Sequence, residues 1–196
     1  MVKYGLDFNG VLADTNRAKS DWIRRNLNIE VEPWKTDKTL CVPIIGAEAY
    51  EGMSDYVFSR NSTLLMQEVP GALSGVACLS RHADLYLVTM RSGKRMDYAK
   101  EWLEQMDILG HFTGFGDIRR PDGTTKTKVE LAREFGLDVM IDDDERHLVS
   151  GVAKEKLILF KNGASSDYTV PNGVDLATNW EDVRRILGYW DKRDCF

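Results

Sequence analysis

Short, mostly apolar runs that end in polar residues recur along the chain and predict its strands. They lie at residues 2–6, 85–88, 139–141 and 157–160. Runs of this kind are typical of strands that are buried on both faces of a sheet. We therefore expect the core of the protein to contain a sheet of short, buried strands.

Helical periodicity lies between these predicted strands. In residues 95–106 and 127–135 the apolar side chains recur every three or four positions, so each segment has one apolar face. Gly136 is a natural helix stop, and Asn179 is suited to cap a closing helix over residues 180–187. Strands that alternate with helices predict a parallel α/β sheet, whose ligands bind at the carboxyl ends of the strands.

Residues 16–70 interrupt this alternation. Residues 21–27 and 48–65 have helical patterns, and no convincing buried strand separates them. We therefore predict a small helical domain at residues 16–70, inserted after the first strand, and a core formed by residues 1–15 and 71–196. The inserted segment is rich in aromatic residues, most of which we expect in a small core while a minority face a substrate: Trp22, Trp34, Tyr50, Tyr56 and Phe58.

Composition excludes several classes of partner. The 196 residues include 26 Lys and Arg against 31 Asp and Glu, a formal net charge of −5. This mild acidity argues against binding to a nucleic-acid polymer, which normally needs a basic surface. No apolar run approaches the roughly 18 residues of a membrane span, and the first residues lack the apolar stretch of a signal peptide. Cys41, Cys78 and Cys195 are far apart and lack metal-ligand spacing, so we expect reduced thiols and a cytoplasmic location.

Three polar clusters directly follow predicted strands. They are residues 7–14 (DFNGVLAD), residues 89–91 (TMR) and residues 142–144 (DDD). If the strands are neighbours in a parallel sheet, the clusters meet at one edge. Adjacent carboxylates raise each other's pKa and are unfavourable without a cation, and Mg²⁺ prefers carboxylate, carbonyl, water and phosphate oxygens. We therefore expect Asp142 and Asp143 to bind Mg²⁺.

The same clusters contain the groups that phosphoryl transfer needs. Asp7 is a candidate nucleophile, because a carboxylate can form an aspartyl-phosphate. Thr89 is placed to hydrogen-bond a phosphoryl oxygen, and Gly10 would let the backbone approach the phosphate and offer its N–H. A lysine would offset the negative charge of both reactants. Lys126 and Lys128 are the candidates, and on a helix they point about 200° apart, so only one of them can face the site.

In order and spacing these motifs resemble those of the haloacid dehalogenase (HAD) superfamily of phosphotransferases. Residues 7–11 (DFNGV) look like its DxDG(T/V) signature, Thr89 matches its second motif, and residues 141–143 (IDD) look like its acidic fourth motif. Lys128, fourteen residues before Asp142, fits the lysine of the third motif, with Lys126 as the alternative. The variants GVLAD, VTMR and IDDDERHL look most like the branch of the 5′(3′)-deoxyribonucleotidases and related bacterial nucleotidases.

This resemblance implies a fold, a cofactor and a reaction. The fold is a Rossmann-like core, a parallel sheet flanked by helices, with a small helical cap of the C1 type inserted after the first strand. Asp7 would attack the phosphorus of a small phosphorylated metabolite or nucleotide. Mg²⁺ would be held by the carboxylates of Asp7 and Asp142 and the backbone carbonyl of Asn9, with Asp143 binding through water or orienting these ligands. The residues expected to bind the phosphate or substrate are Gly10, Thr89, Met90, Arg91 and Lys128.

Asn9 departs from the family pattern, which has an acid at this position. That acid protonates the leaving oxygen and later activates water, whereas an amide does not exchange protons near neutral pH. General acid–base catalysis is worth roughly 10²–10⁴ in rate, so Asn9 predicts a slow phosphatase. Three explanations remain open: a deliberate Asp→Asn substitution, an enzyme that uses a good leaving group or a cap residue instead, or a protein that binds phosphate or nucleotide with weak or no turnover.

A dehalogenase is a more distant alternative. It would use the same Asp7 nucleophile on carbon and needs no metal ion, so it leaves Asp142 and Asp143 without a clear role.

Residues close to the motifs have simpler interpretations. Asp14 precedes a helical pattern and is expected to be its N-cap. Arg91 is expected either to contact phosphate or the cap, or to form a surface ion pair. Glu145, Arg146 and His147 are expected at the surface.

Overall fold

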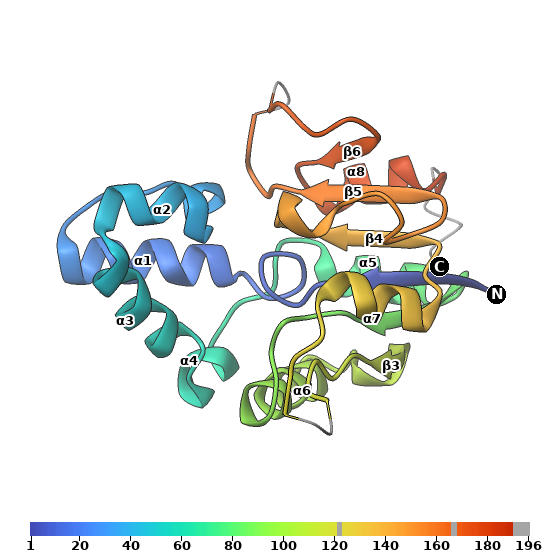
Figure 1. The fold of residues 1–196 in the computed structure, drawn as a ribbon, viewed down its shortest axis with the longest axis horizontal. Coiled ribbons are helices and arrows are strands. Elements are labelled where there is room, and N and C mark those ends of the chain that lie inside the picture. The colour runs from blue at the N-terminus through green and yellow to red at the C-terminus, as the bar shows by residue number, and fades with distance from the viewer. Residues whose placement is uncertain (121–122, 166–167, 190–196) are drawn as a thin grey trace.

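A six-stranded parallel sheet forms the centre of the structure, a computed structural model that describes residues 1–120, 123–165 and 168–189 (Figure 1). Its strands are β1 (Val2–Leu6), β2 (Ala83–Leu87), β3 (Phe112–Phe115), β4 (Val139–Asp142), β5 (Lys156–Phe160) and β6 (Val174–Ala177). They lie in the order β3-β2-β1-β4-β5-β6. Leu6 of β1 is opposite Leu87 of β2 and Ile141 of β4. The residues that follow these three strands therefore emerge side by side at one edge of the sheet.

Helices cover both faces of this sheet. Successive side chains of a strand point to opposite faces, so the apolar strands present hydrophobic side chains on both. In β4, Val139 and Ile141 belong to a hydrophobic cluster that includes side chains of α5 (Ala72–Leu79), α6 (Lys94–Gln105) and α8 (Trp180–Ile186). Met140, between them, belongs to a second cluster, with side chains of α7 (Lys128–Phe135). Burial on both faces explains why the strands are short apolar runs in the sequence. The fold class predicted from the sequence, an α/β protein with a parallel sheet flanked by helices, is confirmed.

Four helices lie between β1 and α5 and are displaced to one side of the sheet (Figure 1). They are α1 (Thr15–Leu27), α2 (Lys38–Ile45), α3 (Ala47–Val57) and α4 (Arg60–Leu64), with the 3₁₀ turn η1 (Pro33–Lys35) between α1 and α2. We call residues 15–64 the helical insertion. It contacts the core through α4, which packs against α6. That residues 16–70 act as a separate cap domain stays a prediction.

Two hydrogen-bonded crossings connect the insertion to the core. The N–H of Asp14 donates to the carbonyl of Gln67 at 2.9 Å, and the N–H of Val69 donates to the carbonyl of Leu12 at 2.8 Å. The outgoing and returning chains thus form a short paired stem directly beside the loop that follows β1.

The predicted elements exist, with some changes at their ends. The predicted helix over residues 21–27 begins earlier, at Thr15, where the Asp14 side chain accepts the N–H of Arg17 at 3.1 Å and so confirms Asp14 as an N-cap. The predicted helix over residues 48–65 is two helices, because Ser59 caps a new one through the N–H of Ser62. The sequence interpretation did not include β3, β6, α2 or α5, nor the short 3₁₀ turns η2 (Leu109–His111) and η3 (Glu145–His147).

One cysteine differs from expectation. Cys78, in α5, is disulfide-bonded, so the expectation of three reduced thiols is wrong for this residue. Cys41 is a free, buried thiol, and Cys195 lies outside the described residues. Distance along the sequence does not limit which thiols meet in the folded chain, and the prediction of a cytoplasmic location loses this argument.

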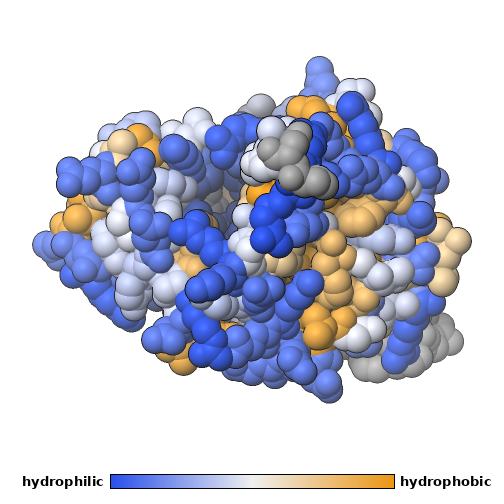
Figure 2. All heavy atoms as spheres, turned by 60° about the horizontal axis from the view of Figure 1, so that its bottom comes forward, coloured by the Kyte–Doolittle hydropathy of each residue, from blue (hydrophilic) through white to orange (hydrophobic). Residues whose placement is uncertain are grey.

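The helices and the visible surface agree with the composition. Within the described ranges, no helix is both long and apolar enough to span a membrane. On the face shown in Figure 2, hydrophilic side chains predominate and hydrophobic ones form separate groups between them, as expected for a chain with 29% charged residues.

Candidate active site

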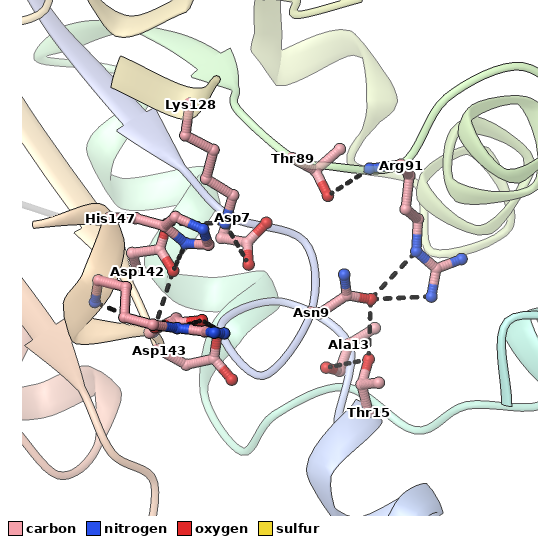
Figure 3. A network of polar contacts seen from close by, with 12 residues as sticks. Asp7, Asn9, Ala13, Thr15, Thr89, Arg91, Lys128, Asp142, Asp143 and His147 are labelled. Atoms are coloured by element: carbon pink, nitrogen blue, oxygen red, sulfur yellow. Dashed lines mark hydrogen bonds and ion pairs between the residues drawn. The ribbon is translucent and has the colours of Figure 1, made fainter. Parts of the chain in front are cut away.

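Three carboxylates meet where the two central strands end (Figure 3). Asp7 directly follows β1, Asp142 is the last residue of β4, and Asp143 comes next. One oxygen of each carboxylate lies within 4.8 Å of the others. Asp7 and Asp142 are buried, at 3% and 0% exposure. Parallel pairing of β1 with β4 is what brings these sequence-distant residues together.

Lys128 joins two of these carboxylates. Its Nζ lies 2.9 Å from Oδ2 of Asp7 and 2.7 Å from Oδ2 of Asp142. Lys128 is the first residue of α7, whose start is fixed by a capping box in which Thr127 and Glu130 bond each other's backbone N–H. Lys126 instead pairs with Glu134 at 2.7 Å. Of the two candidate lysines, the structure therefore brings only Lys128 to the acidic cluster.

Lys128, together with the more distant Lys19, does not balance the charge of this cluster. Burial, followed by the nearby carboxylates of Asp7 and Asp142, raises the pKa of Asp143 to about 7. Burial also raises the pKa of Asp7, more than the ion pair with Lys128 lowers it. For Asp142 burial acts in the same direction, but Lys128 and His147 together outweigh it and hold its pKa below the usual value. The site therefore carries more buried negative potential than its own cations neutralise.

The acidic cluster fits a divalent cation. Oδ1 of Asp7 is the one buried side-chain N or O atom among the described residues that has no hydrogen-bond partner. It belongs to a group of three carboxylates that are close enough to share one ion. Oxygen ligands of this number and charge suit Mg²⁺, which completes its shell with water and phosphate oxygens. Asp7, Asp142 and Asp143 would hold the ion.

Gly10 allows the loop after β1 to pass close to Asp143. Its φ is +72°, and a Cβ atom built there would lie 2.2 Å from Oδ2 of Asp143. That carboxylate also accepts a hydrogen bond from the side chain of Asn16 at 3.0 Å. The N–H of Gly10 donates to the carbonyl of Ala13 at 2.9 Å. The tight turn therefore uses this N–H internally, and the role of Gly10 in phosphate binding stays a prediction.

Arg91 holds the amide of Asn9. Nε and Nη2 of Arg91 donate to Oδ1 of Asn9 at 3.0 and 2.9 Å, and the Thr15 hydroxyl donates to the same oxygen at 3.2 Å. Arg91 is 4% exposed, and burial lowers its pKa to about 10, so it remains charged at neutral pH. Its Nη1 donates to Thr63 of α4 at 3.0 Å. Arg91 thus forms the predicted contact with the insertion, and it forms no ion pair with the described carboxylates.

Thr89 and Met90 occupy different positions at the end of β2. Thr89 is fully buried, and its hydroxyl accepts the N–H of Arg91 at 3.4 Å. Met90 is 42% exposed and lines the cavity above the carboxylates. The roles of both in phosphate binding stay predictions.

His147 was missed by the sequence interpretation. It lies in η3, and its Nδ1 is 3.3 Å from Oδ1 of Asp142. Burial opposes protonation of the ring, but the hydrogen bond and charge of Asp142 outweigh it and raise the pKa of His147. The signal that could have found it is Asp144, which caps η3 through the N–H of Arg146 and turns the chain back toward the strand end. Glu145 and Arg146 are exposed, as expected.

A cavity of about 120 Å³ opens over these groups. Its lining residues come partly from the core and partly from the helical insertion. The core residues are Asp7, Asn9, Met90, Lys128, Asp143, Asp144, Arg146 and His147. The residues from the insertion are Lys19, Asp37, Lys38, Tyr50 and Phe58.

Comparison with known proteins identifies the fold. No family model and no curated protein sequence matches this chain. Solved structures do match over nearly its whole length. A predicted phosphatase from Clostridium acetobutylicum has a TM-score of 0.65 at 16% identity, with 95% of this chain and 97% of that one covered. The magnesium-bound HAD-hydrolase YfnB from Bacillus subtilis has a TM-score of 0.61 at 14% identity, with 95% and 98% covered. The chain has the HAD hydrolase fold.

The HAD fold by itself leaves the chemistry open. The L-2-haloacid dehalogenase from Xanthobacter autotrophicus, with chloropropionic acid covalently bound, matches with a TM-score of 0.59 at 8% identity, covering 97% of this chain and 100% of that one. Phosphatases and dehalogenases thus share the architecture, and the resemblance to the nucleotidase branch stays a prediction. The site itself must distinguish between these reactions.

Proposed function

We propose that this protein is a Mg²⁺-dependent phosphomonoester hydrolase that acts through an aspartyl-phosphate on Asp7. The observation that supports this most strongly is the buried group of Asp7, Asp142 and Asp143, with an unpartnered oxygen on Asp7 and only Lys128 bridging it. Such a group is unfavourable without a cation. A phosphatase uses that cation, whereas a dehalogenase leaves it without a role.

The residues of the chain divide the work as follows. The Asp7 carboxylate attacks phosphorus, the bond from phosphorus to the leaving oxygen breaks, and the phosphoryl group is carried on Asp7. Water then attacks that phosphorus, releasing inorganic phosphate and restoring the Asp7 carboxylate. Lys128, 2.9 Å from Asp7, offsets charge on the nucleophile and on the transferred group. When bound, Mg²⁺ supplies charge compensation for the phosphoryl oxygens.

Asn9 limits this reaction to favourable leaving groups. Its side chain holds no transferable proton, and Arg91 fixes its oxygen as an acceptor. The leaving oxygen therefore departs as an anion or takes its proton from water. We propose that turnover is fastest for esters of acidic alcohols and slow for alkyl phosphates.

We further propose that the substrate is a small phosphorylated metabolite and that residues 16–70 act as a cap over it. The cavity of about 120 Å³ is smaller than the roughly 300–1,000 Å³ typical of drug-sized ligands. A nucleotide, the substrate suggested by the sequence resemblance, is the larger alternative and would extend beyond this open cavity. The insertion contributes Lys19, Tyr50 and Phe58 to the cavity wall, which supports its role in selecting substrates.

Hydrolysis of p-nitrophenyl phosphate tests the proposal. We expect turnover with Mg²⁺, none in EDTA, and none for Asp7→Asn with either. After an acid quench, mass spectrometry of the protein is expected to find one added phosphoryl group on Asp7. Asp97→Asn, an exposed carboxylate on α6, is the matched control and should behave as the unaltered chain. Turnover by Asp7→Asn equal to that of the unaltered chain would show that Asp7 is not the nucleophile.

The second candidate is a phosphate-binding protein without turnover, which Asn9 favours. In that case inorganic phosphate would bind in the presence of Mg²⁺ while Asn9→Asp remained inactive on every ester. A dehalogenase is the third, and release of halide from a 2-haloacid in EDTA would identify it.

A further inference from the structure

Lys19 is a buried cation that forms no direct ion pair with any described carboxylate, although the charges of Asp143, Asp37 and Asp7 act on it from farther away. It lies on α1, in the helical insertion, and is 7% exposed. The other two buried lysines of the described residues each have a direct carboxylate partner: Lys128 has two, and Lys161 pairs with Asp37 at 3.6 Å. Within the described part of the chain, no carboxylate oxygen lies within 4.0 Å of the Lys19 ammonium. The protein thus buries this charge without neutralising it by direct contact.

The contacts that Lys19 does make leave donors unused. Its Nζ reaches one oxygen, the backbone carbonyl of Thr36, at the long distance of 3.4 Å. The ring centroids of Tyr50 and Phe58 lie 5.9 and 5.8 Å from the same atom. Aromatic faces attract a cation and exclude water from it, but they accept none of the three N–H groups of an ammonium in the way an oxygen does. A buried polar group normally has hydrogen-bond partners, so the environment of Lys19 is prepared for a further acceptor.

The position of Lys19 indicates where that acceptor comes from. Lys19 lines the same cavity as Asp7 and Lys128, but from the insertion rather than from the core. A phosphomonoester whose phosphoryl group is at Asp7 extends its organic part toward the walls that the insertion provides. Lys19, between Tyr50 and Phe58, is the buried cation on that side.

We propose that Lys19 is a specificity-determining residue that binds a carboxylate on the organic part of the substrate. This proposal rests on the proposed function of the site. The cavity of about 120 Å³ suits a short organic part that places a carboxylate at Lys19 while the phosphoryl group lies at Asp7. The aromatic rings shield the ammonium from water, so an anion there forms a stronger interaction than it would at the surface. The protein therefore selects carboxylated phosphomonoesters over neutral ones of equal length.

Calorimetric binding of two phosphonates tests this without requiring turnover. The probes are 3-phosphonopropanoate and propylphosphonate, which differ by the terminal carboxylate, each titrated in Mg²⁺. The unaltered chain should bind the carboxylated probe about 10- to 100-fold more tightly, the range expected for a hydrogen bond between buried charged groups. Lys19→Met should reduce the preference to within about threefold and leave propylphosphonate binding unchanged. Lys35→Met, an exposed lysine of the same insertion, is the matched control and should retain the preference.

Other outcomes overturn the proposal. Absence of a preference in the unaltered chain refutes it even if Lys19→Met does not fold, which a thermal unfolding scan would detect. Equal loss of both probes in a folded Lys19→Met would show that Lys19 binds the phosphoryl group instead. A preference that depends on Lys19, without hydrolysis of any ester, would refute the proposed function but not this inference. Hydrolysis of esters without a preference for the carboxylated probe would refute this inference but not the proposed function.

Discussion

Replacing Lys128 by methionine is expected to destabilise the metal-free protein strongly. The Lys128 ammonium lies 2.9 Å from Asp7 and 2.7 Å from Asp142, and all three side chains are at most 4% exposed. Removing one partner of a buried ion pair typically costs about 3–5 kcal/mol, because the remaining charge stays buried without compensation. Asp7 loses its cationic partner and Asp142 keeps only His147, so we expect a loss in the upper part of that range near pH 7.

Lys126→Met is the matched control. Its ammonium pairs with Glu134 at 2.7 Å, but the two side chains are 22% and 50% exposed, and pairs of this kind contribute only about 0–1 kcal/mol. Thermal unfolding in EDTA, followed by circular dichroism, measures both variants. For a chain of this size, about 1 kcal/mol lowers the melting temperature by roughly 2–4 °C. We therefore expect a decrease of roughly 8–20 °C for Lys128→Met and of at most about 4 °C for Lys126→Met.

Two further conditions sharpen the result. Lowering the pH should reduce the penalty of Lys128→Met, because Asp7 and Asp142 become protonated and no longer carry buried charge. Adding Mg²⁺ should restore part of the lost stability by the same compensation. If Lys128→Met in EDTA at pH 7 is no less stable than Lys126→Met, the electrostatic interpretation of the site is wrong.

Three other perturbations probe the same cluster. The pKa of Asp143 is about 7 in the folded protein and roughly 3.9 in the unfolded chain, so the free energy of unfolding of the metal-free protein should fall as pH rises from 4 to 7. Urea titrations would contradict this if Asp143→Asn showed the same fall in unfolding free energy over that pH range. Asn9→Asp should accelerate hydrolysis of alkyl phosphates more than that of p-nitrophenyl phosphate, because a protonated carboxyl supplies the proton that a poor leaving oxygen needs. The gain should be only about tenfold, because Arg91 would hold most of the new carboxyl ionised. Equal gains on both esters would exclude an acid role. Gly10→Ala should weaken Mg²⁺ binding, measured by calorimetry, at least about tenfold, because the added methyl group displaces Asp143. Gly52→Ala is the control: the space around Gly52 is open, so its Mg²⁺ affinity should not change.

The acidic cluster could be predicted because its signal is local. Each carboxylate ends a short apolar run, and in a parallel sheet of neighbouring strands such ends meet at one edge. Motif spacing favoured Lys128 over Lys126. The structure agrees, because the capping box at Thr127 makes Lys128 the first residue of α7 and its ammonium reaches Asp142.

Elements and residues that depend on tertiary contacts were harder to predict. β3 reads FTGF and β6 reads VDLA, and each is too short and too polar to stand out from a loop. α2 contains Pro43, which is typical of a helix boundary rather than a helix interior. Lys19 carries no local mark of its position, because it reaches the cavity only after the insertion packs against the core, and the one local signal for His147 is the cap formed by Asp144.

The paired stem at residues 12–14 and 67–69 has a consequence for how such a protein changes over time. Both crossings are fixed to each other by backbone hydrogen bonds, and backbone bonds are indifferent to side-chain identity. Recombination that exchanges the whole stretch between them would therefore keep its point of attachment while replacing the wall that includes Lys19. Asp7, Lys128 and Asp142, which belong to the core, would be kept, so a new ligand preference could arise in one step without rebuilding the chemistry beneath it.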